Sequence, residues 1–591
     1  MISSKPIRLV DYVLRYKWHY LAGLLSLLSA SFVVMLPPVI IRQAIDAIAA
    51  GTTSEALLGF GATILGLALL ESVVRYTARR LISGISRRIE YDLRTDLATH
   101  LMALDQNFYL KAQTGDLMAR ATNDLQRVRD LLGPSLQDLF RLPAMMAVGF
   151  VLMLSIDQVL AVLALAYYPV IAFFIIILRT RMESRFRAVQ DQFGTLTIRV
   201  QENISGMRTI KAYVQEDAEI ANFVAANQEM VRRAMSWARF SAGLIALTTV
   251  AGGASLSLVL WFGGHSVVEG RLSLGQFVQF IAYLAILANP VLSLGWTVSI
   301  LQGGIAGWRR VKEILVQEPD IADPLVPVHL ARIQGVVEFS NVTFGYDGHP
   351  VLRNINLKVP AGTAVAIVGE TGAGKTTLMN LLVRLHDPWE GVISLDGVDI
   401  RSLPLEQLRA AVGVVPQESF LFSEPLSDNI AYASPNPDPV RLQAALATSQ
   451  LVTDLPQFGD GLDTMVGERG VTLSGGQKQR AALARALLKE APVLVLDDAL
   501  SHVDTHTEEE ILHRLIPLIH ERTTFLIAHR TSTVIAADFI VALENGSIAE
   551  MGTHQELLDR HGVYARLYHR QTLAEQLESP DGIDAANGIR A

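Results

Sequence analysis

The chain has 591 residues, of which 50% are hydrophobic, with a formal net charge of −8 and no cysteine. This length predicts more than one domain, and the positive mean hydropathy of +0.32 indicates segments that cross a membrane. Without cysteine the chain can form no disulfide framework, zinc–thiolate site or iron–sulfur cluster. The acidic balance gives no reason to expect a nucleic-acid partner.

The first 318 residues have the pattern of a helical membrane domain. Residues 5–18 alternate apolar and charged side chains, as in a basic amphipathic helix that lies in a membrane interface. Six apolar segments follow, each long enough to cross a bilayer once a few flanking residues are included. We place these spans at about 19–41, 56–74, 139–156, 158–178, 240–266 and 274–303.

Positive charges predict the orientation of the spans. Arginines gather after the second and fourth spans, whereas the loops after the first, third and fifth contribute Arg42 and Arg271. Because arginine-rich loops stay in the cytoplasm, both termini and the two long connections are expected there. These connections keep helical periodicity and should prolong the spans. Each is broken once, near 108–118 and 202–211, where Gly115 and Gly206 would permit a reversal around a short transverse helix.

From residue 331 to residue 570, strand-like and helix-like segments alternate, as in an α/β domain. Residues 319–330 are the expected linker, and residues 571–591 are expected to form a short helix and a flexible tail. Two segments near the start of the domain, 337–339 and 342–346, have the pattern of edge strands. Tyr346 at their end could stack on an adenine base.

A glycine-rich stretch lies between a strand-like and a helix-like segment of this domain. It reads Gly369-Glu370-Thr371-Gly372-Ala373-Gly374-Lys375-Thr376-Thr377. In this context the pattern is a Walker A motif, which binds a nucleoside triphosphate. Its backbone N–H groups would surround the phosphates, and its glycines allow a close approach. Lys375 would reach the β- and γ-phosphates, and the Thr376 hydroxyl would hold Mg²⁺.

A second anion site is predicted at the start of another helix. Its residues are Ser474, Gly475, Gly476 and Gln477, which supply a hydroxyl and backbone N–H donors. One phosphate loop cannot surround a γ-phosphate from both sides. We therefore expect head-to-tail dimerisation, in which each protomer closes the nucleotide site of the other.

Polar residues that follow buried-strand patterns complete the candidate site. Gln417 follows a short apolar strand, and its amide can coordinate Mg²⁺ and position water. Asp497 ends another strand as a Walker B carboxylate that would hold Mg²⁺ through its waters. Asp498 comes next, where a general base for water would be placed. His529 follows a further strand and could hydrogen-bond the γ-phosphate.

In this order and spacing, the motifs over residues 5–570 resemble an ABC transporter, specifically an exporter half-transporter. The resemblance implies a membrane bundle of six helices with long cytoplasmic extensions, fused to an α/β P-loop NTPase domain of ABC type. It also implies that Tyr346 is the A-loop aromatic, Gln417 the Q-loop residue and Glu468 the X-loop glutamate. Asp504 would belong to the D-loop, Ser501-His502-Val503-Asp504. The breaks near 115 and 206 resemble coupling helices, and the second would reach into the partner's domain.

Two residues depart from the family pattern. Asp498 replaces the usual glutamate after Walker B, and His502 replaces a small D-loop residue. Because a misplacement of roughly 1 Å can cost about 10²-fold in rate, the site built on these Walker motifs is expected to hydrolyse ATP slowly or not at all. The intact Ser474–Gln477 motif would complete a competent site with a non-identical subunit. A homodimer in which Asp498 is a weaker base is the alternative, and an engineered substitution is a third.

By resemblance, the chain uses ATP and Mg²⁺ to export an amphipathic or hydrophobic drug, lipid or peptide by alternating access across a bacterial inner membrane. A homodimeric exporter or lipid flippase is the alternative, and a gated channel or regulatory ABC protein is less favoured. The membrane spans exclude a soluble ABC ATPase acting on nucleic acid. Residues of the sixth span could line a cavity or make helix–helix contacts. They are Gln276, Gln279, Asn289 and Trp296.

Overall fold

The computed structural model describes residues 8–467, 473–528 and 530–578. The chain divides into two compact units. The first comprises Met1–Met102 and Gln113–Gln317, and the second comprises Ala103–Ala112 and Glu318–Ala591. A short internal segment, 103–112, therefore groups with the C-terminal unit although it lies within the predicted membrane domain.

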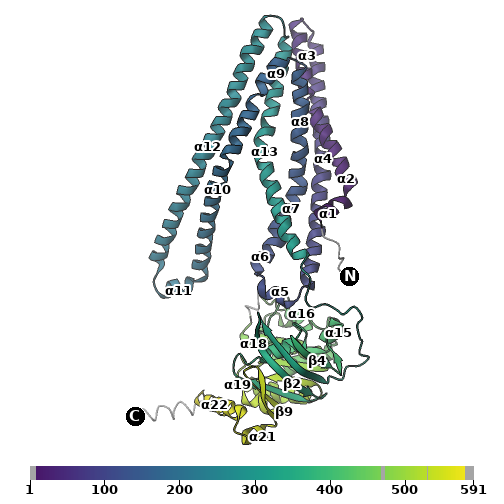
Figure 1. Cartoon of the computed structure of the whole chain (residues 1–591), viewed down its shortest axis with the longest axis vertical. Helices are drawn as coiled ribbons and strands as arrows, with labels where there is room; N and C mark the ends of the chain where they lie inside the picture. Colours follow the sequence, from purple (N-terminus) through teal and green to yellow (C-terminus); the bar gives the residue numbers. More distant parts are fainter. Residues whose placement is uncertain (1–7, 468–472, 529, 579–591) are drawn as a thin grey trace. The chain divides into compact units, whose positions relative to one another are not determined.

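The first unit is entirely helical in its described part (Figure 1). Its elements are α1 (Leu9–Arg15), α2 (Lys17–Val33), α3 (Pro37–Ala49), α4 (Ser54–Ala103), α6 (Thr114–Ala119), η1 (Arg120–Asp124), α7 (Leu125–Asp130), η2 (Leu131–Ser135), α8 (Leu136–Leu154), α9 (Gln158–Leu165), α10 (Tyr167–Ser205), α11 (Met207–Ala212), α12 (Glu216–Val268) and α13 (Leu274–Leu315). By length and composition, four helical stretches of the described chain can cross a membrane: Lys17–Ala49, Ser54–Ala103, Thr114–Leu154 and Glu216–Val268. The fourth and sixth predicted spans fall in α9–α10 and α13, so the count of six stays a prediction.

Neither predicted helix break depends on a left-handed glycine. The first reversal has two parts, the short helix α5 (Gln106–Lys111) and an extended Ala112–Gln113 step with φ values of −86° and −82°. Gly115 instead lies in the first turn of α6, so its predicted role at the break is wrong. Gly206 does end α10, with φ −90°. A Cβ there would lie 3.0 Å from the Glu202 carbonyl oxygen, so close approach and not backbone handedness favours glycine.

Small residues and one helix break allow close packing in the first unit. A Cβ added at Gly149 of α8 would lie 2.9 Å from Leu287 Cδ1 of α13, so the absence of a side chain brings these helices together. The helical structure is interrupted between α2 and α3. There the Met35 carbonyl accepts a hydrogen bond from Tyr283 Oη (3.1 Å). Such a bond satisfies a backbone group that the break leaves outside a helix.

The two glutamines of the sixth predicted span make structural contacts. Gln276 forms a capping box with Ser273 at the start of α13. Gln279 is buried and donates to Tyr283 Oη (3.2 Å). The side chains of Asn289 and Trp296 lie outside the described residues, so their assignment to a cavity stays a prediction.

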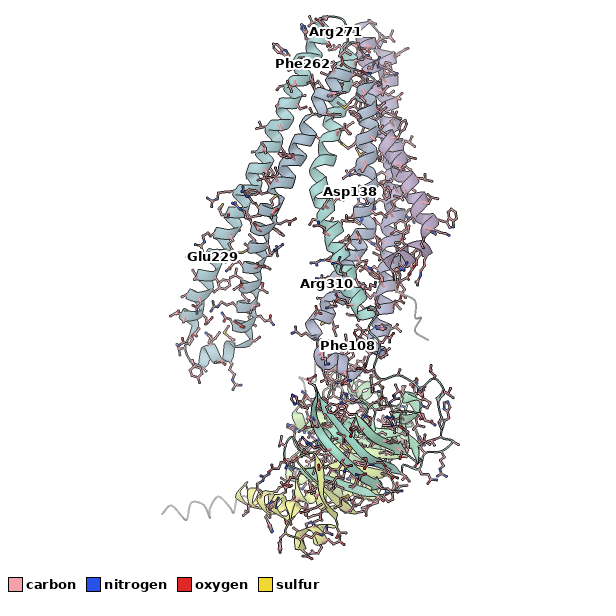
Figure 2. The ribbon with its side chains drawn as sticks, viewed as in Figure 1. Phe108, Asp138, Glu229, Phe262, Arg271 and Arg310 are labelled. Carbon is pink, nitrogen blue, oxygen red and sulfur yellow. The ribbon has the colours of Figure 1, made fainter. Side chains whose placement is uncertain are left out.

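Ion pairs link side chains in the polar parts of these long helices, and Figure 2 labels Glu229 and Arg310, which belong to two of them. Arg310 near the end of α13 donates through Nε to Asp124 Oδ2 of η1 (2.6 Å), and Asp124 is buried. Glu229 of α12 pairs with Arg233 one turn later (2.6 Å). The short helix α11 lies across the ends of α10 and α12 (Figure 1).

The second unit contains two β-sheets. Its strands are β1 (Val337–Tyr346), β2 (His349–Val359), β3 (Ala364–Gly369), β4 (Glu390–Leu395), β5 (Val398–Asp399), β6 (Val412–Val415), β7 (Val493–Asp497), β8 (Thr523–Ile527), β9 (Phe539–Glu544) and β10 (Ser547–Gly552). The small sheet has the order β2-β1-β4-β5 and the large sheet has the order β10-β9-β3-β8-β7-β6. The two predicted edge strands form one strand, β1, which pairs with β2 and β4 on either side. The edge prediction is therefore wrong, because alternation of polar and apolar residues does not distinguish an edge strand from an inner antiparallel one.

Several helices of the second unit pack against the large sheet. Besides α5, the helices of this unit are α14 (Lys375–Leu382), α15 (Leu405–Ala410), α16 (Leu426–Ala431), α17 (Pro439–Thr448), α18 (Gly475–Leu488), α19 (Thr505–His520), α20 (Thr531–Ile535), α21 (His554–Asp559) and α22 (Val563–Glu578). Along β3, Val365 and Ile367 belong to a hydrophobic cluster shared with the small sheet, while Ala366 and Val368 belong to one shared with α18 and α19. A parallel strand buried on both faces explains why β3 is apolar throughout. The C-terminal helix begins at Val563, earlier than the predicted boundary at 571.

Candidate functional site

Four loops of the second unit leave the same edge of the large sheet. Strands β3, β8, β7 and β6 are neighbours and parallel, so their carboxyl ends lie together. The glycine-rich loop follows β3, residue 528 follows β8, Asp498 follows β7, and Gln417 comes two residues after β6. Ligands of open α/β sheets bind at this edge. The fold thus brings together motifs that lie far apart in the sequence.

The glycine-rich loop has the backbone geometry that its sequence predicts. Gly372 and Gly374 have φ values of +84° and +97°, which other residues rarely adopt. Gly369 lies so close to β9 that a Cβ would approach the Leu543 carbonyl oxygen to 2.6 Å. Thr376, in the first turn of α14, is exposed, whereas Thr377 is buried. The loop can therefore hold an anion against the N-terminus of α14.

Lys375 is a buried cation at the centre of this loop. Its Nζ donates to the carbonyl oxygens of Gly369 (2.8 Å) and Glu370 (3.0 Å). Burial lowers the pKa of Lys375, although the negative charges of Asp497 and Asp498 oppose that shift. An anion bound in the loop would favour the charged form of the lysine. The donor set thus fits a phosphate group.

Asp497 and Asp498 have different environments. Asp497 is buried at the end of β7. Asp498 is half-buried and has a φ of +50°, a conformation that aspartate tolerates better than most residues. Its N–H donates to Ile527 O (2.9 Å), and its carbonyl accepts from Ser501 Oγ (3.0 Å) and Gln479 Nε2 (3.3 Å). The Asp498 backbone is therefore fixed from both sides.

The second predicted anion site is the N-terminus of α18. Ser474 caps this helix, because its Oγ accepts from Gln477 N (3.3 Å) while Gln477 Oε1 accepts from Ser474 N (3.0 Å). Ser474 and Gly475 are exposed, so this end of α18 is open to solvent. In the D-loop, Asp504 caps α19 by accepting from Thr507 N (3.0 Å). This hydrogen bond lowers the pKa of Asp504, so the described contacts of Asp504 are those of a helix cap.

Tyr346 belongs to an aromatic cluster that also includes Phe344 and His386. Its ring meets the His386 ring edge-on (5.5 Å between centroids), and His386 stacks on Phe344 (5.2 Å). Helix α5 also contacts the cluster, because His386 Nδ1 is hydrogen-bonded to Asn107 Oδ1 (2.8 Å). One buried imidazole therefore contacts both the predicted adenine-stacking residue and the predicted coupling helix.

Comparison with known proteins identifies the family. Residues 20–291 match the family described as ABC transporter transmembrane region, and residues 352–501 match the family described as ABC transporter. The chain is 37% identical to the probable multidrug resistance ABC transporter ATP-binding/permease protein YheI of Bacillus subtilis (strain 168), over 94% of this chain and 96% of that protein. This chain belongs to the ABC transporter family.

Other similar proteins are exporters and flippases by name. This ABC transporter is 37% identical to an ATP-dependent lipid A-core flippase of Syntrophus aciditrophicus (strain SB), over 90% of this chain and 88% of that protein. A solved structure of a bacterial Atm1-family ABC exporter with ATP bound superposes with a TM-score of 0.76, at 28% identity, over 95% of this chain and 98% of that chain. The chain is thus an integral membrane protein of the multidrug and lipid-exporter type that couples ATP hydrolysis to transport.

Two predicted site residues of this ABC transporter, His529 and Glu468, lie outside the described residues. The segment after His529 is nevertheless anchored by Glu508 of α19, which is 2% exposed. Glu508 forms an ion pair with Arg530 and accepts from the hydroxyls of Ser532 and Thr533 (3.3 Å each). Sequence reasoning missed Glu508, because an acidic residue in an amphipathic helix gives no local signal of burial.

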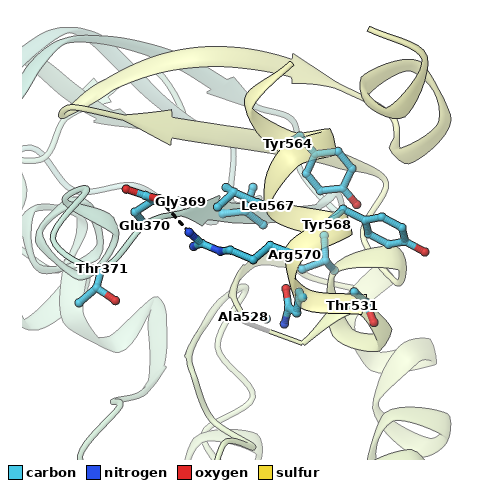
Figure 3. Close-up of a pocket in the computed structure, with 12 residues that line it drawn as sticks. Gly369, Glu370, Thr371, Ala528, Thr531, Tyr564, Leu567, Tyr568 and Arg570 are labelled. Carbon is cyan, nitrogen blue, oxygen red and sulfur yellow. Dashed lines mark hydrogen bonds and ion pairs between the residues drawn. The ribbon is translucent and has the colours of Figure 1, made fainter. Parts of the chain in front are cut away.

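The C-terminal helix of the transporter also reaches the glycine-rich loop (Figure 3). Arg570 of α22 pairs with Glu370 (3.2 Å), beside a cavity of about 300 Å³ that Tyr564 and Tyr568 help to line. Both charged side chains are 70% exposed, so their ion pair contributes little to stability. Helix α22 thus borders the phosphate loop, and its last residues are those for which the sequence predicts a short helix.

Proposed function

We propose that this ABC transporter exports an amphipathic or hydrophobic substrate by alternating access, as one half of a heterodimer whose own Walker site is catalytically degenerate. The observation that carries the proposal is Asp498 at the position of the catalytic base, beside an intact Ser474–Gln477 motif. We call the Ser474–Gln477 segment the signature motif. One composite site would combine this chain's Walker motifs with the signature motif of its partner. The other would combine this chain's signature motif with a partner that retains the catalytic glutamate.

In the first site, Lys375 would bind the β- and γ-phosphates and Tyr346 would stack on the adenine. Three oxygen ligands lie at the carboxyl ends of the parallel strands: the Thr376 hydroxyl, the Asp497 carboxylate and the Gln417 amide. Oxygen ligands of this kind fit Mg²⁺. When bound, Mg²⁺ neutralises charge on the phosphates. His529 would hydrogen-bond the γ-phosphate, which makes it a switch between the nucleotide states.

The anchored backbone of Asp498 supports the proposed degeneracy. Aspartate is one methylene shorter than glutamate, so its carboxylate is withdrawn from an attacking water. The hydrogen bonds to Ile527, Ser501 and Gln479 prevent the backbone from advancing to compensate. A displacement of roughly 1 Å lowers the rate by about 10²-fold. Slow hydrolysis at this site would leave ATP bound between the two domains for many cycles of the other site.

A homodimeric exporter or lipid flippase is the second candidate. It is favoured by the similarity to proteins named as lipid A-core flippases. In this case Asp498 would itself be a weak general base in two equal sites. The sparse charge within the predicted spans favours a lipid, a drug or a hydrophobic peptide over a polar solute in either case.

ATP turnover distinguishes the two candidates. The samples are this chain alone, this chain with the product of its genomic neighbour, and Asp498→Glu in both settings. For the heterodimer we expect a nearly silent lone chain, an active pair, and a gain from Asp498→Glu within the pair. Brisk turnover by the lone chain as a dimer would overturn the heterodimer and support the second candidate. Lys375→Ala gives the background for the lone chain.

We also propose a bacterial inner membrane as the location, with the second unit and both termini in the cytoplasm. Arginines follow the second and fourth predicted spans, and positive charge is retained on the cytoplasmic side. This orientation places the ATP-binding unit where ATP is made.

A further inference from the structure

The D-loop histidine of this chain lies against the start of α18. A Cβ added at Gly475 would lie 3.5 Å from His502 Cβ and 3.6 Å from its Cδ2, so the imidazole flanks the first residue of the helix. His502 is exposed, as are Ser474 and Gly475. The imidazole of His502 therefore lies on the same surface as the Ser474–Gln477 segment. The family pattern has a small residue at the position of His502.

One buried amide fixes the tautomer of the neutral imidazole. The backbone N–H of His502 donates to Gln479 Oε1 (2.9 Å), and a backbone N–H can only donate. The oxygen of the amide must therefore face that N–H, which turns the Gln479 NH₂ toward His502 Nδ1 (3.0 Å) and Ser501 Oγ (2.9 Å). Facing a donor, Nδ1 accepts a hydrogen bond. The ring proton of neutral His502 is consequently on Nε2.

The Nε2–H group is available for a ligand. Both hydrogen bonds of the His502 ring to described residues are made by Nδ1, and within the described chain Nε2 has no partner. Gln479 is 2% exposed and Ser501 is half-buried, so the Nδ1 side of the ring is held by the protein and the opposite side is free. The ring is thus oriented by its own domain before any partner arrives.

We propose that His502 donates a hydrogen bond from Nε2 to the terminal phosphate of the nucleoside triphosphate that the facing subunit presents to this chain's Ser474–Gln477 segment. This inference rests on the proposed head-to-tail pairing of the two domains and adds a nucleotide-binding residue to it. A neutral hydrogen-bond donor suits the position of His502, because the terminal phosphate would already accept hydrogen bonds from the backbone N–H groups at the start of α18. In the heterodimer, His502 would act in the hydrolytically competent site.

Three substitutions separate this role from a structural one. In His502→Asn the amide occupies the place of Nδ1, which keeps a partner for Gln479 but removes the outward donor. In His502→Gln the amide nitrogen reaches the place of Nε2, which keeps the outward donor. His502→Ala removes both, and His506→Ala, an exposed histidine on α19, is the matched control.

The measurements are the KM for MgATP of whichever assembly turns over, and the MgATP and MgADP concentrations that give half-maximal thermal stabilisation. For His502→Ala and His502→Asn we expect the KM for MgATP and the MgATP concentration for half-maximal stabilisation each to rise roughly tenfold. This is the effect of losing one hydrogen bond to a charged oxygen. The ADP value should stay unchanged, because ADP lacks the terminal phosphate. His502→Gln and His506→Ala should stay within about twofold of the wild type.

Two results would overturn the inference. If His502→Asn behaves as the wild type while His502→Gln does not, the histidine serves only to hold the D-loop through Gln479. If ATP and ADP values move together or not at all, the imidazole does not contact the terminal phosphate. Failure of the proposed function is seen separately, as brisk turnover by the lone wild-type chain or as no turnover by the wild-type pair, and the stabilisation measurements still apply there.

Discussion

The buried imidazole of His386 makes the stability of the ATP-binding unit sensitive to pH. Burial lowers the pKa of His386 below its ordinary value of 6.5, and the nearby Asp105 only partly opposes the shift. Below pH 6.5 the unfolded chain therefore binds a proton that the folded chain resists, and the free energy of unfolding falls as the pH falls. The neutral form and its hydrogen bond to Asn107 are fully present above pH 6.5.

We accordingly predict that the melting temperature of the wild type falls between pH 7 and pH 5.5. In His386→Phe, which keeps the stacking ring but cannot be protonated, this fall should be smaller. Thermal unfolding at several pH values measures both. His513→Phe, at an exposed position of α19, is the control and should retain the wild-type dependence. Equal slopes for wild type and His386→Phe would contradict the prediction.

The ion pair of Glu508 and Arg530 should hold the segment that follows His529. Arg530 is 35% exposed by its side chain but Glu508 only 3%, so removal of the arginine leaves a buried carboxylate without its cation. We expect Arg530→Ala to destabilise the unit by about 3 kcal/mol, near the lower end for a buried pair. Glu508→Gln together with Arg530→Ala should recover much of this loss, since no buried charge remains.

A double-mutant cycle in denaturant measures this coupling. Each single variant and the double variant are unfolded in parallel, and ATP turnover is followed in the same samples. Additive changes in the free energy of unfolding would show that the two side chains act independently. In a homodimer, turnover should fall in every variant that releases the segment, including the double variant, because the segment's position and not its charge is at issue. In the heterodimer, the competent site does not contain this segment and should keep its turnover.

At the scale of elements, α5 is the part of the predicted membrane domain that packs with the ATP-binding unit. Asp105 at its N-terminus accepts from Asp320 N (2.6 Å), and Asn107 is hydrogen-bonded to His386. Because His386 also contacts Tyr346, a change at this predicted adenine-stacking residue can reach α5 through two contacts. The contacts thus describe a direct physical connection between the predicted adenine site and a predicted coupling helix.

Asn107→Ala should weaken this connection without removing the ATP site. We predict that ATP turnover is largely retained while ATP-driven uptake of a fluorescent amphipathic dye into inverted vesicles falls about fivefold, as for the loss of one neutral hydrogen bond. Lys111→Ala, at the exposed end of α5, is the matched control. A parallel loss of turnover and uptake would indicate damage to the ATP site and not to coupling.

For the whole molecule, the predicted orientation can be tested because the chain contains no cysteine. Thr53, between α3 and α4, and Gln215, between α11 and α12, are both exposed. We predict that an impermeant maleimide labels Thr53→Cys in intact cells. It should label Gln215→Cys only after the membrane is opened. The reverse pattern would place the arginine-rich connections outside the cytoplasm.

Much of this protein could be predicted from the sequence because the decisive signals are local. A phosphate loop is made by consecutive residues, with Gly372 and Gly374 where positive φ values are needed. Likewise, uncharged segments long enough to cross a membrane are contiguous, and the helices α4 and α12 extend beyond the spans as their periodicity predicts. Where a local rule was ambiguous it failed: Gly115 marked no break, and β1 is not an edge strand.

Tertiary structure alone decided the contacts between distant residues. Asn107 and His386 are 279 positions apart, and no periodicity relates them, yet packing joins them beside Tyr346. The same holds for Gln479, which binds His502 only because α18 and the end of β7 are adjacent in the fold. The sequence by itself determined the family, the domains to be expected and the chemistry of the motifs, since each depends on neighbouring residues. Which side chains orient that chemistry depends on burial and distance, which exist only in the folded chain.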